Sequence, residues 1–206
     1  MFWIRASVNV WHRLLTETIR NIGFEVTRLD SDVWMGCNGF GGYNHLGAHT
    51  DNVMCVSKDA EAVMDQIKEI YVMKKVAEPE YHLGCDYEQV THKNTTFCMK
   101  SCGTYIKEAL TKVADIVGKT VKDLRIEFTL KVLKDKPELD SSPLLKEHNH
   151  RLYQQLIGIG IWLGQIGRID ITHAVSSLSR FSVAPSEGHL SRIEKVYGYL
   201  KNWNSA

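Results

Sequence analysis

The sequence predicts an α+β fold. Apolar residues recur at steps of three and four in several segments of the 206-residue chain, which is typical of amphipathic helices. Between these segments lie short runs, bounded by glycines, in which apolar and polar residues alternate as they do in strands. Hydrophobic residues make up 44% of the chain and charged residues 24%, so the chain has the composition of a protein with a packed core.

The N-terminal part is expected to form a helix and then a hairpin. Residues 11–22 carry apolar side chains at helical spacing, and a glycine follows them at a natural helix stop. Residues 33–35 and 46–56 have the composition of strands. The glycine-rich stretch 36–42 connects these two strands, and we expect the pair to form a hairpin. A phosphate-binding loop is the weaker reading of these glycines, because they have neither the dinucleotide-binding nor the P-loop spacing.

The middle of the chain alternates between the two kinds of element. Ser57 and Asp59 are candidate caps for a helix that follows them, since their side-chain oxygens can accept hydrogen bonds from free backbone N–H groups. Residues 81–90 are expected to form a strand that pairs with residues 95–99. A helix is then expected over residues 105–117.

The C-terminal part is expected to be helical and to follow a linker. Residues 119–149 are charged and contain Pro137 and Pro143, and their one periodic piece, residues 125–128, is a candidate short strand. Three helices are expected after the linker, over residues 152–166, 171–181 and 186–202. We therefore predict three segments, at residues 1–118, 119–149 and 150–206.

Charge and cysteine usage restrict the class of protein. The formal net charge is +1, so the chain as a whole has no strong basic field that would attract nucleic acid. Its five cysteines are an odd number, which favours reduced thiols and an intracellular location over a disulfide scaffold. No apolar run approaches the roughly 20 residues that span a bilayer, and the first residues do not have the pattern of a secretory signal, so we expect no membrane association.

One stretch suggests a specific chemistry. Asp51 and Asn52 lie between residues of strand composition in Ala48-His49-Thr50-Asp51-Asn52-Val53-Met54-Cys55-Val56. Taken alone, Asp and Asn are ordinary turn residues. However, residues 48–59 resemble the catalytic hairpin of copia-type retrotransposon reverse transcriptases, in which a Tyr-x-Asp-Asp turn is followed by an apolar strand, a Ser or Asn and a helix.

Further motifs of the same family follow in the same order. Tyr81-His82-Leu83-Gly84 resembles the Tyr-Phe-Leu-Gly element beside the primer. The tail is similar to the family through Tyr153-Gln154-Gln155-Leu156-Ile157-Gly158, Gly167-Arg168-Ile169-Asp170-Ile171 and Ala174-Val175-Ser176-Ser177-Leu178-Ser179-Arg180-Phe181. The resemblance covers nearly the whole chain. It implies a partial palm with a mixed or antiparallel sheet and packed helices, followed by a helical thumb-like and connection region.

The resemblance implies two-metal nucleotide transfer, for which this chain lacks part of the ligand set. The family uses Mg²⁺ ions held by carboxylates. Asp51 keeps the first carboxylate of the hairpin, Asn52 replaces the second by an amide, and His49 stands where the family has Tyr. The remaining indispensable carboxylate belongs to a strand that the family places well before the first residue of this chain. We therefore expect Asp51 to bind Mg²⁺ only weakly and the chain alone to be inactive, unless a complementing polymerase chain supplies the missing part.

The implied partners are an RNA template and a DNA primer. Tyr81, Leu83 and Gly84 are the residues that the resemblance places beside the primer. Arg180 is a further candidate nucleic-acid contact, within a set of tail cations that could form one face: Arg180, Arg192, Lys195 and Lys201. Charges on a solvated helical surface are the simpler explanation of that set.

Other readings remain open. A non-catalytic module that binds nucleic acid or protein is the main alternative to a polymerase fragment. A zinc site at His92, Cys98 and Cys102 is disfavoured, because a closed structural site needs four ligands and the chain has no Cys-x-x-Cys pair. Arg168 and Asp170 are more simply a structural pair or a helix start than a nucleic-acid contact.

Overall fold

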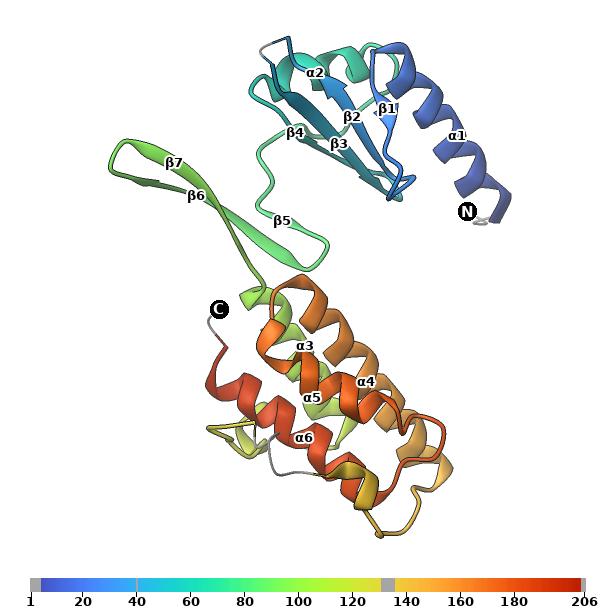
Figure 1. Cartoon of the computed structure of the whole chain (residues 1–206), viewed down its shortest axis with the longest axis vertical. Coiled ribbons are helices and arrows are strands. Elements are labelled where there is room, and N and C mark those ends of the chain that lie inside the picture. Colours follow the sequence, from blue (N-terminus) through green and yellow to red (C-terminus); the bar gives the residue numbers. More distant parts are fainter. Residues whose placement is uncertain (1–4, 40, 131–135, 205–206) are drawn as a thin grey trace. The chain divides into compact units, whose positions relative to one another are not determined.

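The computed structural model describes residues 5–39, 41–130 and 136–204, and these form two compact units. The first unit comprises Met1–Pro79 and the second Glu80–Ala206. The described residues contain six α-helices and two antiparallel sheets (Figure 1), so the α+β prediction is confirmed. The division between the units falls inside the predicted segment 1–118 and does not coincide with either end of the segment 119–149.

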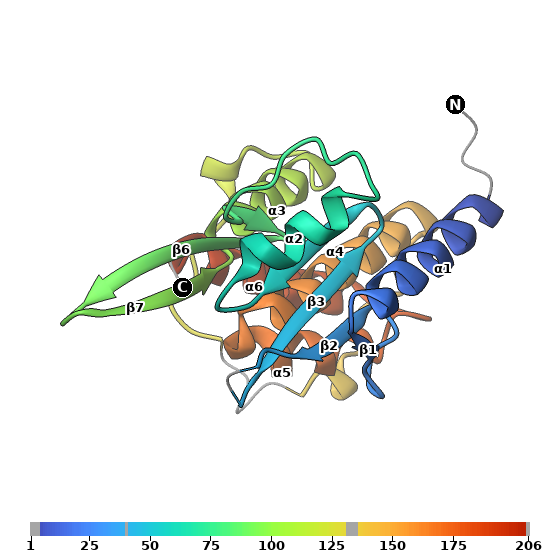
Figure 2. The same cartoon turned by 90° about the horizontal axis from the view of Figure 1, so that it is seen from above.

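The first unit is a four-stranded antiparallel sheet with two helices. Its strands are adjacent in chain order. The elements are α1 (Arg5–Asn21), β1 (Glu25–Val26), β2 (Val33–Cys37), β3 (Tyr43–His49), β4 (Asn52–Val56) and α2 (Ala60–Lys68). Both helices lie along the sheet in Figure 2, and Leu15 of α1 and Ile67 of α2 belong to one buried cluster with Trp34 and Leu46 of the sheet. The helices therefore cover the face of the sheet that carries Trp34 and Leu46.

Local signals explain where α1 ends and where α2 begins. Gly23 follows α1 with φ +92°, a conformation that glycine adopts at little cost. Asp59 caps α2, since its carboxylate accepts a hydrogen bond from the backbone N–H of Ala62 at 3.2 Å. The Ser57 hydroxyl accepts a bond from the Asp59 N–H at 3.0 Å, so Asp59 is the cap and Ser57 supports it.

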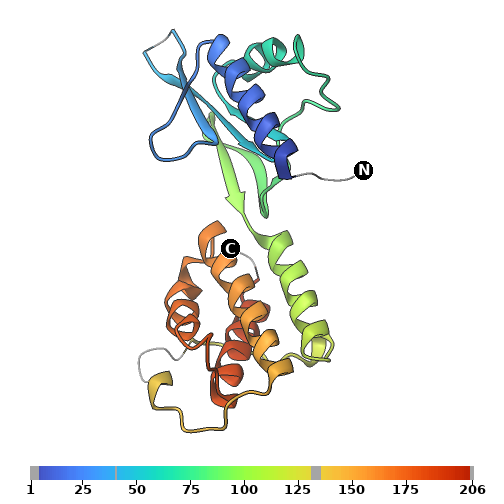
Figure 3. The ribbon, with the colours of Figure 1, turned by 90° about the vertical axis from the view of Figure 1, so that its right-hand side faces the viewer.

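The second unit joins a three-stranded antiparallel sheet to four helices. Its elements are β5 (Tyr81–His82), β6 (Cys85–His92), β7 (Thr95–Ser101), α3 (Gly103–Ile116), α4 (Glu147–Ile166), α5 (Ile169–Ser179) and α6 (Glu187–Asn202). The helices share a core that includes the fully buried Ile106, Tyr153, Leu156 and Tyr197. Within this unit α3 and α4 run side by side (Figure 3), while the β6–β7 hairpin extends away from the helices and is mostly exposed (Figure 1).

Two predicted strands were wrong in the same way, because each is two strands joined by a tight turn. Residues 46–56 are interrupted at Thr50-Asp51, and residues 81–90 at Leu83-Gly84. Thr50 and Leu83 both have positive φ values, 55° and 52°, a conformation that side chains other than those of Gly, Asn and Asp rarely adopt. Neither turn carries the usual two-residue hairpin sequence Asn-Gly or Asp-Gly, so strand composition extended across both turns, although Asp51 and Gly84 are residue types favoured in turns.

The segment 119–149 is packed rather than extended through solvent. Its described residues include two short 3₁₀ turns, Val121–Asp123 and Pro137–Leu139, and residues 125–128 form no strand. Leu124 is buried in the core of the second unit. The N–H of Glu127 donates to the carbonyl of Gly198 in α6 at 3.2 Å. Residues 124–128 therefore run along α6. The predicted strand at residues 125–128 was wrong because Glu127 bonds to the backbone of α6 and the Phe128 carbonyl accepts from the Trp203 indole.

The three C-terminal helices were predicted correctly to within a few residues. Ser186 begins α6 as its cap, accepting a hydrogen bond from the His189 N–H at 3.3 Å. All five cysteines are free thiols. Among the described helices, none combines the length and the apolar character needed to cross a membrane.

Candidate functional site

The hairpin around Asp51 is a sharp two-residue turn. His49 of β3 pairs with Asn52 of β4, so Thr50 and Asp51 form the tip. The Thr50 hydroxyl lies 3.1 Å from the Asp51 carboxylate and 2.7 Å from the His49 carbonyl oxygen. Asp51 and Asn52 are both exposed, so the carboxylate at the tip is accessible to solvent and to ions.

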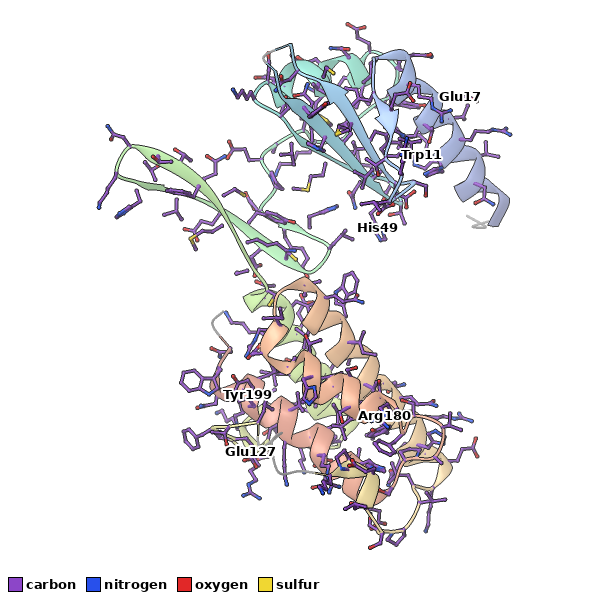
Figure 4. All side chains as sticks on the ribbon, in the orientation of Figure 1. Trp11, Glu17, His49, Glu127, Arg180 and Tyr199 are labelled. Atoms are coloured by element: carbon purple, nitrogen blue, oxygen red, sulfur yellow. The ribbon has the colours of Figure 1, made fainter. Side chains whose placement is uncertain are left out.

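Aromatic side chains hold this turn against the helices of the first unit. The indole N–H of Trp11 in α1 donates to the Thr50 carbonyl at 2.8 Å; Figure 4 labels Trp11 and, next to Thr50 in the sequence, His49. Trp11 meets Tyr71 edge to face with ring centroids 5.1 Å apart. The hydroxyls of Tyr71 and Thr18 are 2.9 Å apart, and Thr18 is buried. The turn that carries Asp51 is therefore fixed to α1 and to the segment after α2.

The acidic groups near this turn do not complete a metal site. Asp32 lies beside β3, where its carbonyl accepts from the Ala48 N–H at 2.9 Å, but its carboxylate lies 2.7 Å from Nε2 of His12. In the described part of the chain, no group of three or more His, Cys, Asp or Glu side chains is placed to hold a metal ion. Two-metal phosphoryl transfer needs several carboxylate oxygens around both ions. The residues described around Asp51 therefore do not fit a two-magnesium centre, and we derive no catalytic step from them.

The residues expected beside a primer lie in the second unit, Tyr81 in β5 and Leu83 and Gly84 in the turn between β5 and β6. Tyr81 and Leu83 are exposed to 47% and 40%. Gly84, in contrast, is buried. A Cβ added at this position would lie 3.2 Å from Ile166 Cδ1 and from Trp162 Nε1. Tyr81 and Leu83 are thus available for contact, whereas Gly84 has a packing role.

A cleft in the second unit contains Arg180. The cleft has a volume of about 690 Å³ and lies between α5, α6 and residues 125–130 and 137–138. Figure 4 shows Arg180 at the end of α5. Four basic side chains line the cleft, namely Arg125, Arg180, Arg192 and Lys195. Three of the four tail cations selected from the sequence thus share one cleft. The fourth, Lys201, instead donates to the carbonyls of Lys122 and Leu124 at 2.7 Å.

Arg125 is the cleft residue that sequence reasoning missed. Arg192 and Lys195 are three apart on one helix, and that spacing predicts a shared face. Arg125 has no comparable signal, since it reaches the cleft through the packing of an irregular segment.

Arg168 and Asp170 form a structural pair, as expected. Arg168 is only 2% exposed, and its Nε and Nη2 donate to the two oxygens of Asp170 at 2.9 and 2.7 Å. These hydrogen bonds hold the pKa of Asp170 below its usual value. Arg168 also donates to the Trp203 carbonyl and lies over the Tyr199 ring, with its Cζ 5.7 Å from the centroid. The pair fixes the start of α5 to the end of α6.

Comparison with curated proteins found a similar transposon protein. The chain is 23% identical to the putative transposon Ty5-1 protein YCL074W of Saccharomyces cerevisiae over 209 aligned residues, which cover 97% of this chain. The chain is a distant relative of a transposon protein. This similarity supports a retrotransposon-derived origin. The alignment spans 62% of that protein, so the chain covers less than two thirds of it. No family model and no solved structure matches the chain.

Proposed function

We propose that the chain is part of a retrotransposon reverse transcriptase, an RNA-directed DNA polymerase, and that it is inactive by itself. The observation that carries this proposal is the two-residue hairpin with Asp51 at its exposed tip, followed by the capped helix α2. The similarity to a transposon protein along 97% of the chain supports it. In this proposal residues 1–118 derive from the end of a palm, and residues 150–206 from a helical connection region that follows the segment 119–149.

The site residues have separate proposed roles. Asp51 is the retained metal-binding carboxylate, and Asn52 is its degenerate neighbour. Tyr81 and Leu83 face a primer, with Gly84 holding their turn in place. A template, a primer and Mg²⁺ would be engaged productively only with a complementing chain that supplies further carboxylates.

Primer extension on an RNA template tests the proposal directly. We expect no DNA product from the chain with Mg²⁺ or with Mn²⁺, because Asp51 belongs to no three-ligand group in the described residues. The Asp51→Ala variant is the matched control. Product that forms with the natural chain and disappears in the variant would show that Asp51 acts in a complete site, and the proposed inactivity would then be wrong.

A second candidate is a non-catalytic module that binds nucleic acid. The four basic side chains gathered in one cleft of the second unit favour it. Binding that weakens steeply with salt, in the absence of any metal-dependent synthesis, is the expected result for such a module. Salt-independent binding would argue against it.

A further inference from the structure

Among its described lining residues, the cleft between α5, α6, residues 125–130 and residues 137–138 has more cationic than anionic side chains. Glu127 and Glu138 line it together with Arg125, Arg180, Arg192 and Lys195. Arg125 Nε lies 3.2 Å from Glu127 Oε1, so this pair is largely neutralised. Arg192 is bound to the Asp140 carboxylate.

Arg180 and Lys195 are the two cleft cations whose charge is not neutralised by an ion pair within the described residues. Both are exposed, and neither has an ion pair with another described residue. One comes from the end of α5 and the other from the second half of α6, so they border the cleft from two different helices. A negatively charged ligand in the cleft would meet both side chains. Arg and Lys are the usual partners of phosphate oxygens.

The part of the cleft that contains Pro137 is held in place by a hydrogen-bond network. Asp140 accepts hydrogen bonds from the Ser142 N–H at 3.1 Å and from the Ser186 hydroxyl at 2.8 Å. The Nε2–H of His189 donates to the carbonyl of Pro137 at 2.9 Å, and Pro137 lines the cleft. These bonds tie residues 137–142 to the start of α6. The cleft is thus formed before any ligand arrives, which lowers the entropic cost of binding.

The arrangement of Ser186, His189 and Asp140 is structural and not a hydrolase triad. In a triad the carboxylate orients the histidine, whereas here Asp140 accepts from the serine. His189 Nδ1 accepts from the backbone N–H of Ser186 at 3.0 Å, so its ring completes the cap of α6. Ser186 and His189 are 3% and 5% exposed, which leaves no access for a substrate.

We propose that this cleft binds the phosphate backbone of a single-stranded nucleic acid, through Arg180 and Lys195. The inference rests on the proposed function and assigns a nucleic-acid contact to a place other than the hairpin of Asp51. The cleft is larger than one phosphate requires, and ten of the sixteen described residues that line it are polar or charged, which suits a phosphate backbone. His173 is exposed on α5 at the same cleft and offers a flat ring for stacking against a base.

Binding of a labelled single-stranded RNA to the whole chain, measured by fluorescence anisotropy, tests the inference. The variant is Arg180→Gln with Lys195→Gln. The matched control is Lys107→Gln with Lys112→Gln, which removes the same charge from exposed positions of α3. Two lost phosphate contacts should weaken binding about tenfold at 0.15 M salt and make the log–log salt slope shallower by about 1.4. The control should bind as the natural chain does, apart from a small general effect of charge.

Three results would overturn the inference, and they are distinguishable. Equal loss in the variant and the control would show that binding is spread over the surface, leaving the proposed function intact. Failure of the natural chain to bind RNA at all would remove both the inference and the nucleic-acid part of the proposed function. Binding of inorganic phosphate that depends on Arg180 and Lys195, with unchanged RNA affinity, would identify a small anion as the ligand. Circular dichroism of each variant verifies that it is folded.

Discussion

Asp140 ties residues 140–142 to α6. Its side chain is 11% exposed and bonds to Arg192, Ser142 and Ser186. Hydrogen bonds from Ser142, Arg192 and Ser186 hold the pKa of Asp140 far below its usual value, so it is ionised in the folded protein. A carboxylate that accepts several bonds in a nearly buried place stabilises the fold more than an exposed ion pair does.

Replacing Asp140 by Ala should therefore lower the free energy of unfolding of the second unit by about 2–3 kcal/mol, because Arg192 and both serines lose their acceptor. Glu147→Ala is the matched control in the same unit. Glu147 pairs with Arg151 while 81% exposed, and its removal should change stability by no more than about 0.5 kcal/mol. Urea unfolding at pH 7 measures both. An equal effect of the two substitutions would contradict the role given to Asp140.

The contribution of Asp140 should also depend on pH. The folded state holds the carboxylate ionised at pH values where the unfolded chain, with a pKa near 3.8, already binds a proton. The stability difference between the natural chain and Asp140→Ala is then fully present above about pH 5 and shrinks as the pH falls through 3.8. Unfolding curves of both proteins between pH 7 and pH 3 measure this stability difference. A difference that grew toward low pH would contradict the prediction.

At the scale of elements, the turn between β5 and β6 depends on Gly84. Gly84 has φ +85°, and a Cβ there would also lie 3.3 Å from Cδ2 of Tyr105. Gly118 follows α3 with φ +65°, but a Cβ there would have nothing within 4 Å. The positive φ favours glycine at both positions, but only at Gly84 would an added Cβ also crowd neighbouring side chains.

This difference predicts unequal costs for two alanine substitutions. Gly118→Ala should cost about 1–2 kcal/mol, the penalty of a left-handed conformation. Gly84→Ala should cost at least about 1 kcal/mol more, since Ile166, Trp162 and Tyr105 must give way. Thermal unfolding of both variants provides the comparison. Equal losses would mean that the turn moves away from α4 freely.

The sequence predicted the helices more accurately than the strands. Helical periodicity is a local signal, and the buried side chains of α3 and α4 follow it. The turns at Thr50 and Leu83 carry non-glycine residues with positive φ, which tertiary contacts maintain: the Trp11 indole bonds to Thr50, and α4 packs against Gly84. The segment 119–149 was read as a linker because its anchors, such as Asp140, are polar groups whose partners are distant in sequence.

The sequence located the candidate site residues but not their surroundings. Asp51, Asn52 and Arg180 were identified from local motifs, and the structure places Asp51 at a hairpin tip and Arg180 in a cleft. The environment of each was not predictable, because it depends on long-range packing. The His12 ring that pairs with Asp32 and the ionic partners of Arg125 and Arg192 belong to that environment.

At the scale of the whole molecule, the described residues form two separate hydrophobic cores. One core gathers Trp34 and Leu46 with α1 and α2, and the other gathers Tyr153 and Leu156 with the C-terminal helices. Each core lies inside one compact unit, Met1–Pro79 or Glu80–Ala206. A unit with its own core can unfold by itself, and a chain with two such units need not show a single cooperative transition.

We therefore expect two thermal transitions that core substitutions shift separately. Leu46 and Leu156 are both fully buried, one in each core, and replacing either by Ala should cost about 2–5 kcal/mol. Leu46→Ala should lower the melting temperature of one transition by about 10 °C and leave the other in place, and Leu156→Ala should do the reverse. Differential scanning calorimetry resolves the two. A single transition that both substitutions lower equally would mean that the cores unfold together, and each unit would then depend on the other for its stability.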